Sequence, residues 1–227
     1  MKDEKNILES AISEGINDCD LHLSEIPDLD LYIDQILTLV SSKSKTASDR
    51  YRDNVLTKTM INNYSKEGLL MPVKGKKYTK EHIVQMLLIY SLKNTLSIGE
   101  IHRVLEGARS EGVCGEELMN SYERHLEGKK LARSYAAECT KSVDRNEGLE
   151  SKNGSDFLVS LLDLLSLSAY IRSIAIELLE ARYPTVEKEK DKEKEKKSEK
   201  EKKDKEKKSS ASRSQSDSSE GAEPDEK

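Results

Sequence analysis

Tryptophan is absent from this chain of 227 residues and phenylalanine occurs once, so the core cannot rest on large aromatic clusters. Only four prolines interrupt the chain, and long alternating β-branched segments are scarce. Leucine, isoleucine, valine, methionine and tyrosine remain as core residues. The sequence therefore predicts a mainly α fold with an aliphatic core, in one globular domain with additions or in two small domains.

The three cysteines, Cys19, Cys114 and Cys139, are far apart and odd in number. They form neither a disulfide framework nor a CxxC motif. Free thiols are typical of the reducing cytoplasm. The first residues contain no apolar run of the length found in signal peptides. We therefore expect a cytoplasmic protein.

The most apolar segment, residues 157–179, is interrupted by Asp163, Arg172 and Glu177. Charges in these places disfavour a membrane span, and we expect no membrane partner. The expected helix around this segment, residues 155–183, is apolar over far more than one face. Two alternatives follow: the helix is buried in its own domain, or it is buried against a partner subunit.

No group of residues has the pattern of a catalytic or metal site. The acidic pairs lack an accompanying nucleophile or base, and no glycine-rich phosphate loop is present. The histidines are scattered, without carboxylates at a repeating ligand spacing. We therefore expect no enzyme activity, no cofactor and no metal. The histidines are His22, His82, His102 and His125.

Charge is distributed unevenly along the chain. Residues 1–49 carry 4 basic and 11 acidic side chains, whereas residues 50–109 carry 11 basic and 5 acidic ones. Residues 110–186 are again acidic. A local basic patch attracts nucleic acid more than net charge does. The pattern therefore indicates a nucleic-acid-binding segment between two acidic flanks.

The central stretch, residues 56–78, predicts a short helix, a glycine stop and a small basic hairpin. Thr57 can accept a backbone N–H of the first helical turn, as N-cap residues do. Gly68 follows the last polar residue and can adopt the left-handed conformation that ends a helix. The inward face of the helix consists of Met60, Ile61 and Tyr64.

The outward face of the same helix carries amines and amides. Lysine offers a charge to phosphates, and asparagine can present its amide edge to adenine in the major groove. The alternative is a solvated surface helix without a ligand. The outward residues are Lys58, Thr59, Asn62, Asn63 and Lys66.

After this helix, Leu69–Met71 is expected to run extended into Pro72. The turn that follows holds Lys74, Lys76 and Lys77, and Tyr78 comes next. These cations suit the DNA backbone, and the tyrosine could contact a sugar or phosphate.

The run from Asn63 to Leu105 resembles the DNA-binding domain of MerR-type bacterial regulators. The whole chain from about Ile26 also looks like an uncharacterised bacterial family of unknown function with this core. The positions that carry the MerR resemblance are Tyr64, Glu67, Gly68, Leu69, Leu70, Pro72, Tyr78, Thr79, Ile89, Leu92, Leu96, Ser97, Glu100 and Ile101.

The resemblance implies a winged helix–turn–helix with a small two-stranded wing, a double-stranded DNA partner and a homodimer formed by the C-terminal helices. Asn62 and Lys76 stand where the family has arginines, so strong phosphate clamping is not expected at these two positions.

The pattern along the chain predicts four segments. Residues 1–25 form an amphipathic helix and a linker, and residues 26–110 the MerR-like winged helix–turn–helix domain. Residues 111–184 form a helical region, and residues 185–227 a disordered Lys/Glu- and Ser-rich tail. The expected helices span residues 3–15, 29–42, 57–67, 79–94, 97–109, 116–141 and 155–183.

Two functional hypotheses follow. The first is a sequence-specific transcriptional regulator with residues 57–67 in the major groove and residues 72–78 on the backbone. The second is a helical protein–protein adaptor that uses the same scaffold without binding DNA, which the acidic flanks and the apolar helix 155–183 favour.

Overall fold

A computed structural model describes residues 7–45, 47–48, 56–144 and 147–185. The chain divides into two units, Met1–Leu179 and Glu180–Lys227. The helical core lies in the first unit, and the described part of the second unit is residues 180–185. Two predictions lie outside the described residues: the start of the first helix and the disorder of 186–227.

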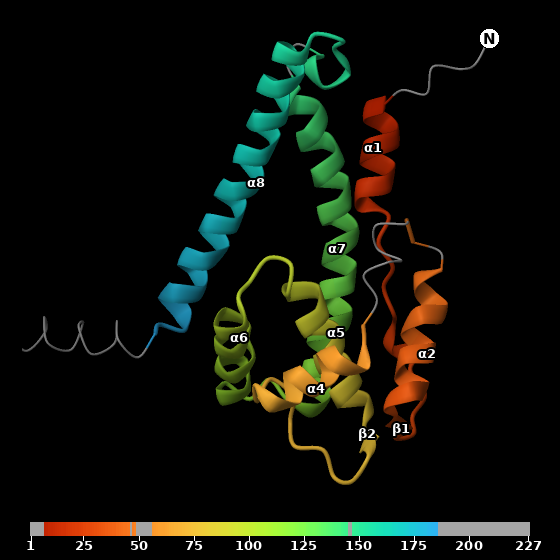
Figure 1. Cartoon of the computed structure of the whole chain (residues 1–227). Coiled ribbons are helices and arrows are strands. Elements are labelled where there is room, and N and C mark those ends of the chain that lie inside the picture. The colour runs from red at the N-terminus through yellow and green to blue at the C-terminus, as the bar shows by residue number, and fades with distance from the viewer. Residues whose placement is uncertain (1–6, 46, 49–55, 145–146, 186–227) are drawn as a thin grey trace, which may run out of the picture. The chain divides into compact units, whose positions relative to one another are not determined.

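The described residues are mainly helical and contain one small antiparallel sheet of two strands, as predicted (Figure 1). The strands are β1 (Leu31–Tyr32) and β2 (Lys77–Tyr78), and two 3₁₀ turns are η1 (Leu23–Glu25) and η2 (Gly148–Glu150). The α-helices are α1 (Ile7–Ile16), α2 (Ile33–Ser44), α4 (Lys58–Lys66), α5 (Lys80–Leu92), α6 (Ile98–Ser110), α7 (Gly115–Val143) and α8 (Gly154–Arg182).

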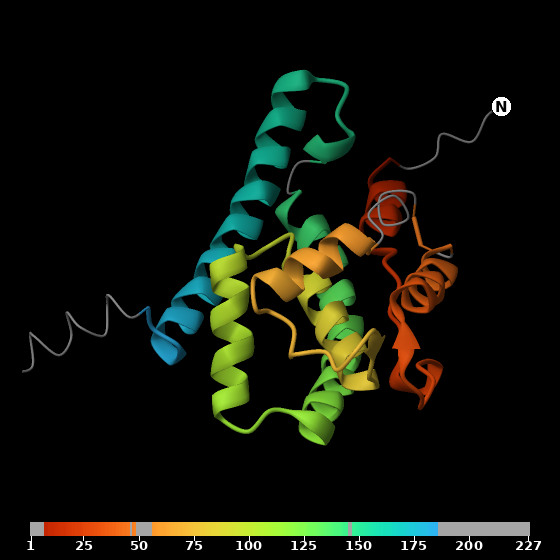
Figure 2. The same ribbon diagram turned by 60° about the horizontal axis from the view of Figure 1, so that its bottom comes forward.

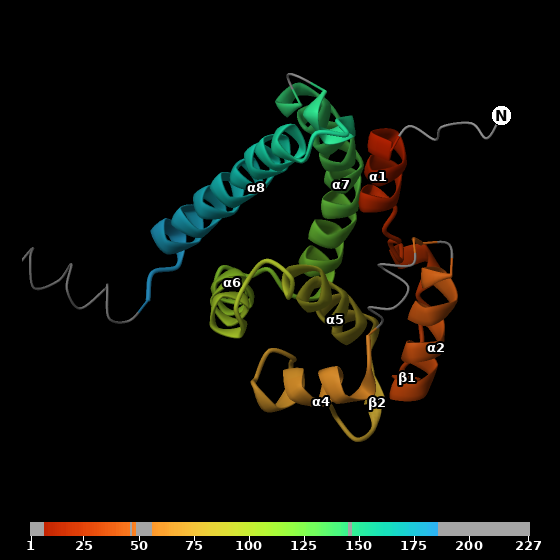
Figure 3. The same cartoon turned by 45° about the horizontal axis from the view of Figure 1, so that its top comes forward.

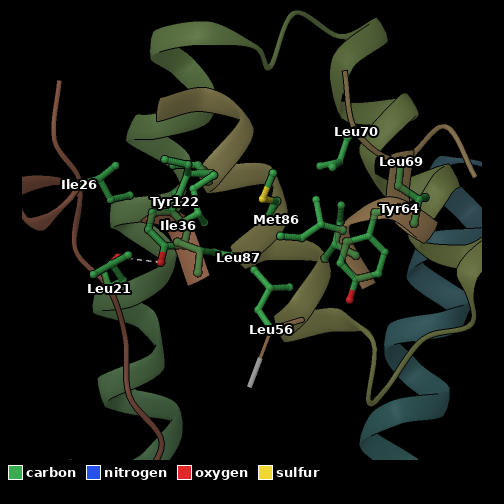
Figure 4. Packing of buried hydrophobic residues seen from close by; sticks show 14 of the residues in the cluster. Leu21, Ile26, Ile36, Leu56, Tyr64, Leu69, Leu70, Met86, Leu87 and Tyr122 are labelled. Atoms are coloured by element: carbon green, nitrogen blue, oxygen red, sulfur yellow. Dashed lines mark hydrogen bonds between the residues drawn. The ribbon is translucent and has the colours of Figure 1, made fainter. Parts of the chain in front are cut away.

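Helix α5 is the centre of the core, which its nearly uniform apolar sequence predicts. Thr79 caps it, because the Thr79 hydroxyl accepts the backbone N–H of His82. Its apolar residues meet side chains from α2, α4, α6 and α7 (Figure 4). The buried residues of α5 are His82, Ile83, Val84, Gln85, Met86, Leu87 and Ile89.

Helix α6 begins with a capping box. The Ser97 backbone N–H donates to Glu100 Oε2 at 2.7 Å, and the Glu100 N–H donates to Ser97 Oγ at 3.3 Å. Ile101 is fully buried on the inner side of this helix. The reciprocal bonds therefore fix where α6 begins relative to the core.

Helix α2 begins later than the predicted span 29–42, at Ile33. The reason is long-range: Leu31 pairs with Tyr78 and Tyr32 with Lys77, which keeps these residues extended. Tyr32 becomes the N-cap, and its N–H donates to Gln35 Oε1 at 2.9 Å. The acidic residues before this helix, Asp28 and Asp30, therefore do not cap it.

The segment after α1 is fastened to α7. The Tyr122 hydroxyl donates to the Leu21 carbonyl oxygen at 2.8 Å, as Figure 4 shows. Asp20 accepts from Lys129 and from Arg133, each at 2.5 Å. Burial alone would raise the pKa of Asp20, but these two hydrogen bonds outweigh it and hold the pKa below its ordinary value.

Helix α8 is not buried in its own domain, so that alternative from the sequence is wrong for the described chain. Nine of its large apolar side chains are 43–68% exposed. By length and composition it could also cross a membrane. It begins at Gly154, where Asn153 Oδ1 accepts the Ser155 N–H at 3.0 Å, so Asn153 and not Ser155 supplies the cap.

Replacing Asp20 by asparagine should lower the free energy of unfolding by about 1–2 kcal/mol at neutral pH, because Lys129 and Arg133 lose a charged partner. Since the folded pKa of Asp20 is depressed, its stabilisation is complete above about pH 4 and is lost as pH falls through the folded pKa.

Urea denaturation at a series of pH values measures this. The difference in free energy of unfolding between the parent and Asp20→Asn should shrink as the buffer becomes acidic. Asp30→Asn, at an exposed position, is the control and should have the same free energy of unfolding as the parent. A difference for Asp20→Asn that stays constant down to pH 2 would contradict the stabilising role of the ionised Asp20.

Candidate nucleic-acid interface

Helix α4 begins at the predicted cap. Thr57 has extended backbone angles, and its hydroxyl accepts the Met60 N–H at 3.2 Å. This bond satisfies one of the donors that the first helical turn leaves free. The start of α4 is therefore fixed by its own cap.

The inner face of α4 anchors it to the core. Ile61 is 0% exposed and Tyr64 7% exposed. Burying side chains of this size stabilises the helix position by roughly 2–3 kcal/mol each. The Tyr64 hydroxyl is buried, without a hydrogen-bond partner among the described residues. Burial raises the pKa of this phenol, so it stays protonated.

Gly68 ends α4 in the left-handed conformation, with φ of +69°, as predicted. The Leu69 N–H donates to the Tyr64 carbonyl at 2.9 Å, and the Gly68 N–H donates to the Ser65 carbonyl at 3.3 Å. These two bonds form a Schellman motif. Leu69 is buried next to Tyr64, which completes the motif with an apolar contact (Figure 4).

The loop after α4 is held at both ends. The Met71 N–H donates to Oε1 of buried Gln85 at 3.1 Å. A turn with Gly75 at φ of +78° then leads into β2. In Figures 2 and 3 α4 and this loop lie at the surface of the first unit, with α5 on their inner side.

The two-stranded sheet is not a local β-hairpin. Strand β2 pairs with β1, which precedes α2, and not with the extended residues 69–71. The Lys77 amine lies 5.2 Å from the centre of the Tyr32 ring. The partner of the predicted wing strand β2 is therefore β1, from a distant part of the chain, and the local sequence pattern does not reveal this long-range pairing.

All but one of the predicted site residues are exposed, and these exposed residues form the candidate surface. Tyr78 is half-buried, and its ring meets the edge of His82 with the ring centres 6.0 Å apart. The exposed members are Lys58, Thr59, Asn62, Asn63 and Lys66 on α4 and Lys74, Lys76 and Lys77 on the loop and β2.

Two carboxylates lie beside this surface. The Lys58 amine is 4.0 Å from Asp34 of α2, and both side chains are largely exposed. Lys80, at the start of α5, donates to Asp28 at 2.6 Å. These pairs neutralise part of the edge nearest to α2. No ion pair within the described residues involves Lys66, Lys74 or Lys76.

One further cation lies near α4 that the sequence did not indicate. Lys93, at the end of α5, lies 4.4 Å from the centre of the Tyr90 ring and 4.0 Å from Met60 Sδ. Partial burial lowers the pKa of this amine. Its distance from α4 in the sequence left no local signal for this position.

The histidines and cysteines do not gather into a second site. His82 is buried, with Nδ1 bonded to the Thr79 hydroxyl at 2.6 Å, and His22 contacts Glu123 at 3.1 Å. Cys19, Cys114 and Cys139 are free thiols. Within residues 7–45, 47–48, 56–144 and 147–185 no three His, Cys, Asp or Glu side chains are placed to hold a metal.

Residues 21–125 match the family model described as a domain of unknown function, DUF1836. The match spans η1 to the middle of α7 and so contains α4, the loop and β2. No curated protein and no solved structure matches the chain. The likeness to a family of unknown function is therefore confirmed over these residues, while the MerR-type core remains a prediction.

Substituting Gly68 by alanine should destabilise the chain by about 1–2 kcal/mol, because a side chain disfavours a φ of +69°. No atom lies within 4 Å of the added carbon, so backbone strain is the whole expected effect.

The matched control is Gly99→Ala in α6, where the new methyl group also meets open space and alanine favours the helix. Thermal or urea unfolding should show a lower stability for Gly68→Ala than for the parent, and an unchanged or higher stability for Gly99→Ala. Equal stability of the two variants would show that the end of α4 is not fixed by Gly68.

Proposed function

We propose that this chain binds double-stranded DNA through α4 and the basic loop and acts as a transcriptional regulator. The observation that carries the proposal is the exposed row of amines and amides on a helix whose opposite face is fully anchored. Ile61 and Tyr64 hold α4 in place, so Asn62 and Asn63 are presented on a rigid element.

The dimensions of α4 suit a major groove. Lys58, Asn62 and Lys66 recur every four residues, so the row extends about 12 Å along the helix axis. A major groove about 12 Å wide admits one α-helix. The two asparagine amides lie between the lysines. In a complex the lysines would face the two phosphate backbones, and the amides would face the base edges between them.

The basic loop gives the second contact. Lys74 and Lys76 are exposed, and the pairing of β2 with β1 holds the end of the loop. Cations at a fixed distance from a groove-binding helix favour phosphates along the groove edge, and such contacts orient a protein without reading sequence. The loop would therefore supply affinity and α4 the specificity.

A second function, a protein–protein adaptor without DNA binding, is favoured by one observation, the exposure of α8. The two functions predict different binding partners. An adaptor should capture one protein in stoichiometric amount and show no affinity for duplex DNA at low salt.

Asn62→Ala and Lys76→Ala should separate the two kinds of DNA contact. The first should lose about 1–3 kcal/mol of discrimination between a preferred duplex and random DNA. The second should weaken binding to all sequences alike and reduce the slope of log K against log salt by about one. Fluorescence anisotropy at several salt concentrations measures both.

Lys130→Ala is the control for a lost charge, because Lys130 is exposed on α7 and pairs with Glu127. It should leave DNA binding unchanged. Absence of duplex binding by the parent at low salt would refute the proposal. Equal loss of specific and random binding in Asn62→Ala would refute the role of α4.

Asp34→Asn should strengthen binding to any duplex by about two- to fivefold at low salt, because the carboxylate competes with phosphate for Lys58 at 4.0 Å. The gain should vanish at high salt, where exposed charges are screened. Anisotropy titrations with one duplex at both salt concentrations test this. Weaker binding by Asp34→Asn would place the DNA away from the start of α4.

A further inference from the structure

Helix α1 lies along α7 without being packed into the core (Figures 1 and 3). No residue of α1 is buried, although Leu8, Ile12 and Ile16 follow one another at helical spacing on one side of it. An apolar face of this kind is normally covered by its neighbours. Here it lines a partly open cavity of about 420 Å³ between α1, α7, η2 and α8.

The lining of this cavity is apolar. Besides the leucine and isoleucines of α1, it includes Ala137 of α7, Leu149 of η2 and Phe157 of α8. Among the described lining residues Thr140 carries the one hydroxyl group, which already donates to the Ala136 carbonyl oxygen at 2.7 Å. Water finds few hydrogen-bond partners in such a space, and apolar cavities in proteins hold hydrocarbon instead.

The volume of the cavity suits a small organic molecule. Ligand-binding cavities of proteins measure roughly 300–1,000 Å³. An engineered apolar cavity of about 150 Å³ already binds benzene. The cavity beside α1 therefore has room for roughly two aromatic rings or for an alkyl chain of medium length.

The polar contacts that join α1 to the other lining elements are mainly acidic. Glu150 Oε1 of η2 accepts the Leu8 N–H at 3.3 Å, and Glu9 pairs with the Lys141 amine of α7 at 2.6 Å. Two carboxylates thus stand against one amine in these contacts. An anionic ligand would be repelled by this charge, so an uncharged molecule fits the cavity better.

The two ends of α1 are fastened unequally. Just after its C-terminal end, Asp20 forms partly buried ion pairs with Lys129 and Arg133 of α7. Near its N-terminal end the pair Glu9–Lys141 is more than half exposed, and exposed ion pairs stabilise little. Helix α1 can therefore open at its N-terminal end while its C-terminal end stays attached.

We propose that the cavity between α1, α7 and α8 binds a small, uncharged, apolar molecule, and that α1 is its lid. Binding removes the inner face of α1 and the lining side chains from water, which the hydrophobic effect favours. The site is separate from the proposed DNA interface, because it uses no residue of α4 or of the basic loop.

Fluorescence titration of the full chain with N-phenyl-1-naphthylamine, without DNA, tests the proposal. This uncharged aromatic dye fluoresces strongly in apolar surroundings, and the parent should bind one molecule per chain. Because the carboxylates beside α1 repel an anion, 1-decanol should displace the dye at lower concentration than decanoate does. Absence of saturable dye binding, or stronger displacement by decanoate, would overturn the proposal.

Ala137→Trp places an indole in the space that the dye would take and should raise the dye's dissociation constant about tenfold or more. The chain has no other tryptophan, so the emission of the introduced indole reports its own surroundings and should lie at the short wavelengths of an apolar site. Ala132→Trp, at an exposed position of α7 outside the cavity, is the matched control. It should show the emission of a solvated indole and unchanged dye binding.

The single phenylalanine gives a second measurement that needs no substitution. Fluorine-labelled phenylalanine marks Phe157 alone, so the fluorine NMR spectrum of the chain contains one signal, from the cavity lining. Saturation with 1-decanol should shift this signal.

Circular dichroism checks that each variant keeps its helices. An unshifted fluorine signal would overturn the proposal. Dye binding that is unchanged in a folded Ala137→Trp would also overturn it and would place the dye on the exposed face of α8. Failure of the chain to bind DNA would leave these outcomes unaffected.

Discussion

The burial of Ile61 and Tyr64 against the core around α5 is the contact on which the candidate site depends. A helix of nine residues is not stable alone in water, so its position comes from packing. Thr57 fixes where α4 begins, and Gly68 fixes where it ends. These inward and terminal contacts hold α4, and of its outward side chains only Lys58 forms an ion pair with another described residue, Asp34.

The same region also carries a constraint that opposes DNA binding. Strand β1 steadies the basic loop through β2, but its neighbours in the chain are acidic, and Asp34 and Asp28 reach the lysines at the edge of the site. The element that orders the loop therefore reduces the positive potential on the side nearest to α2. Lys66, Lys74 and Lys76 form no ion pair within the described residues, so their charge is the part that would attract phosphates most strongly.

Local sequence signals predicted much of this structure because their physical causes are local. The caps of α4, α5 and α6, the glycine stop and the buried α5 all follow from residues within a few positions of each other. The pairing of Leu31 with Tyr78 shortened α2 and could not be predicted, because it joins distant residues. The exposure of the predicted site residues from Lys58 to Lys77 was predictable from local spacing, whereas Asp34 and Lys93 come near α4 only through the fold. The exposure of α8 was unpredictable for a related reason, since composition indicates that a helix needs a partner but not where the partner comes from.

The central claim is that the exposed side of α4 reads duplex DNA, and selection of bound duplexes from a random pool by the purified full chain tests it most directly. After repeated rounds at low salt, sequencing should show a shared motif that fills one major groove, enriched well above the starting pool. A pool that remains random, or a chain that retains no duplex at all, would contradict the claim.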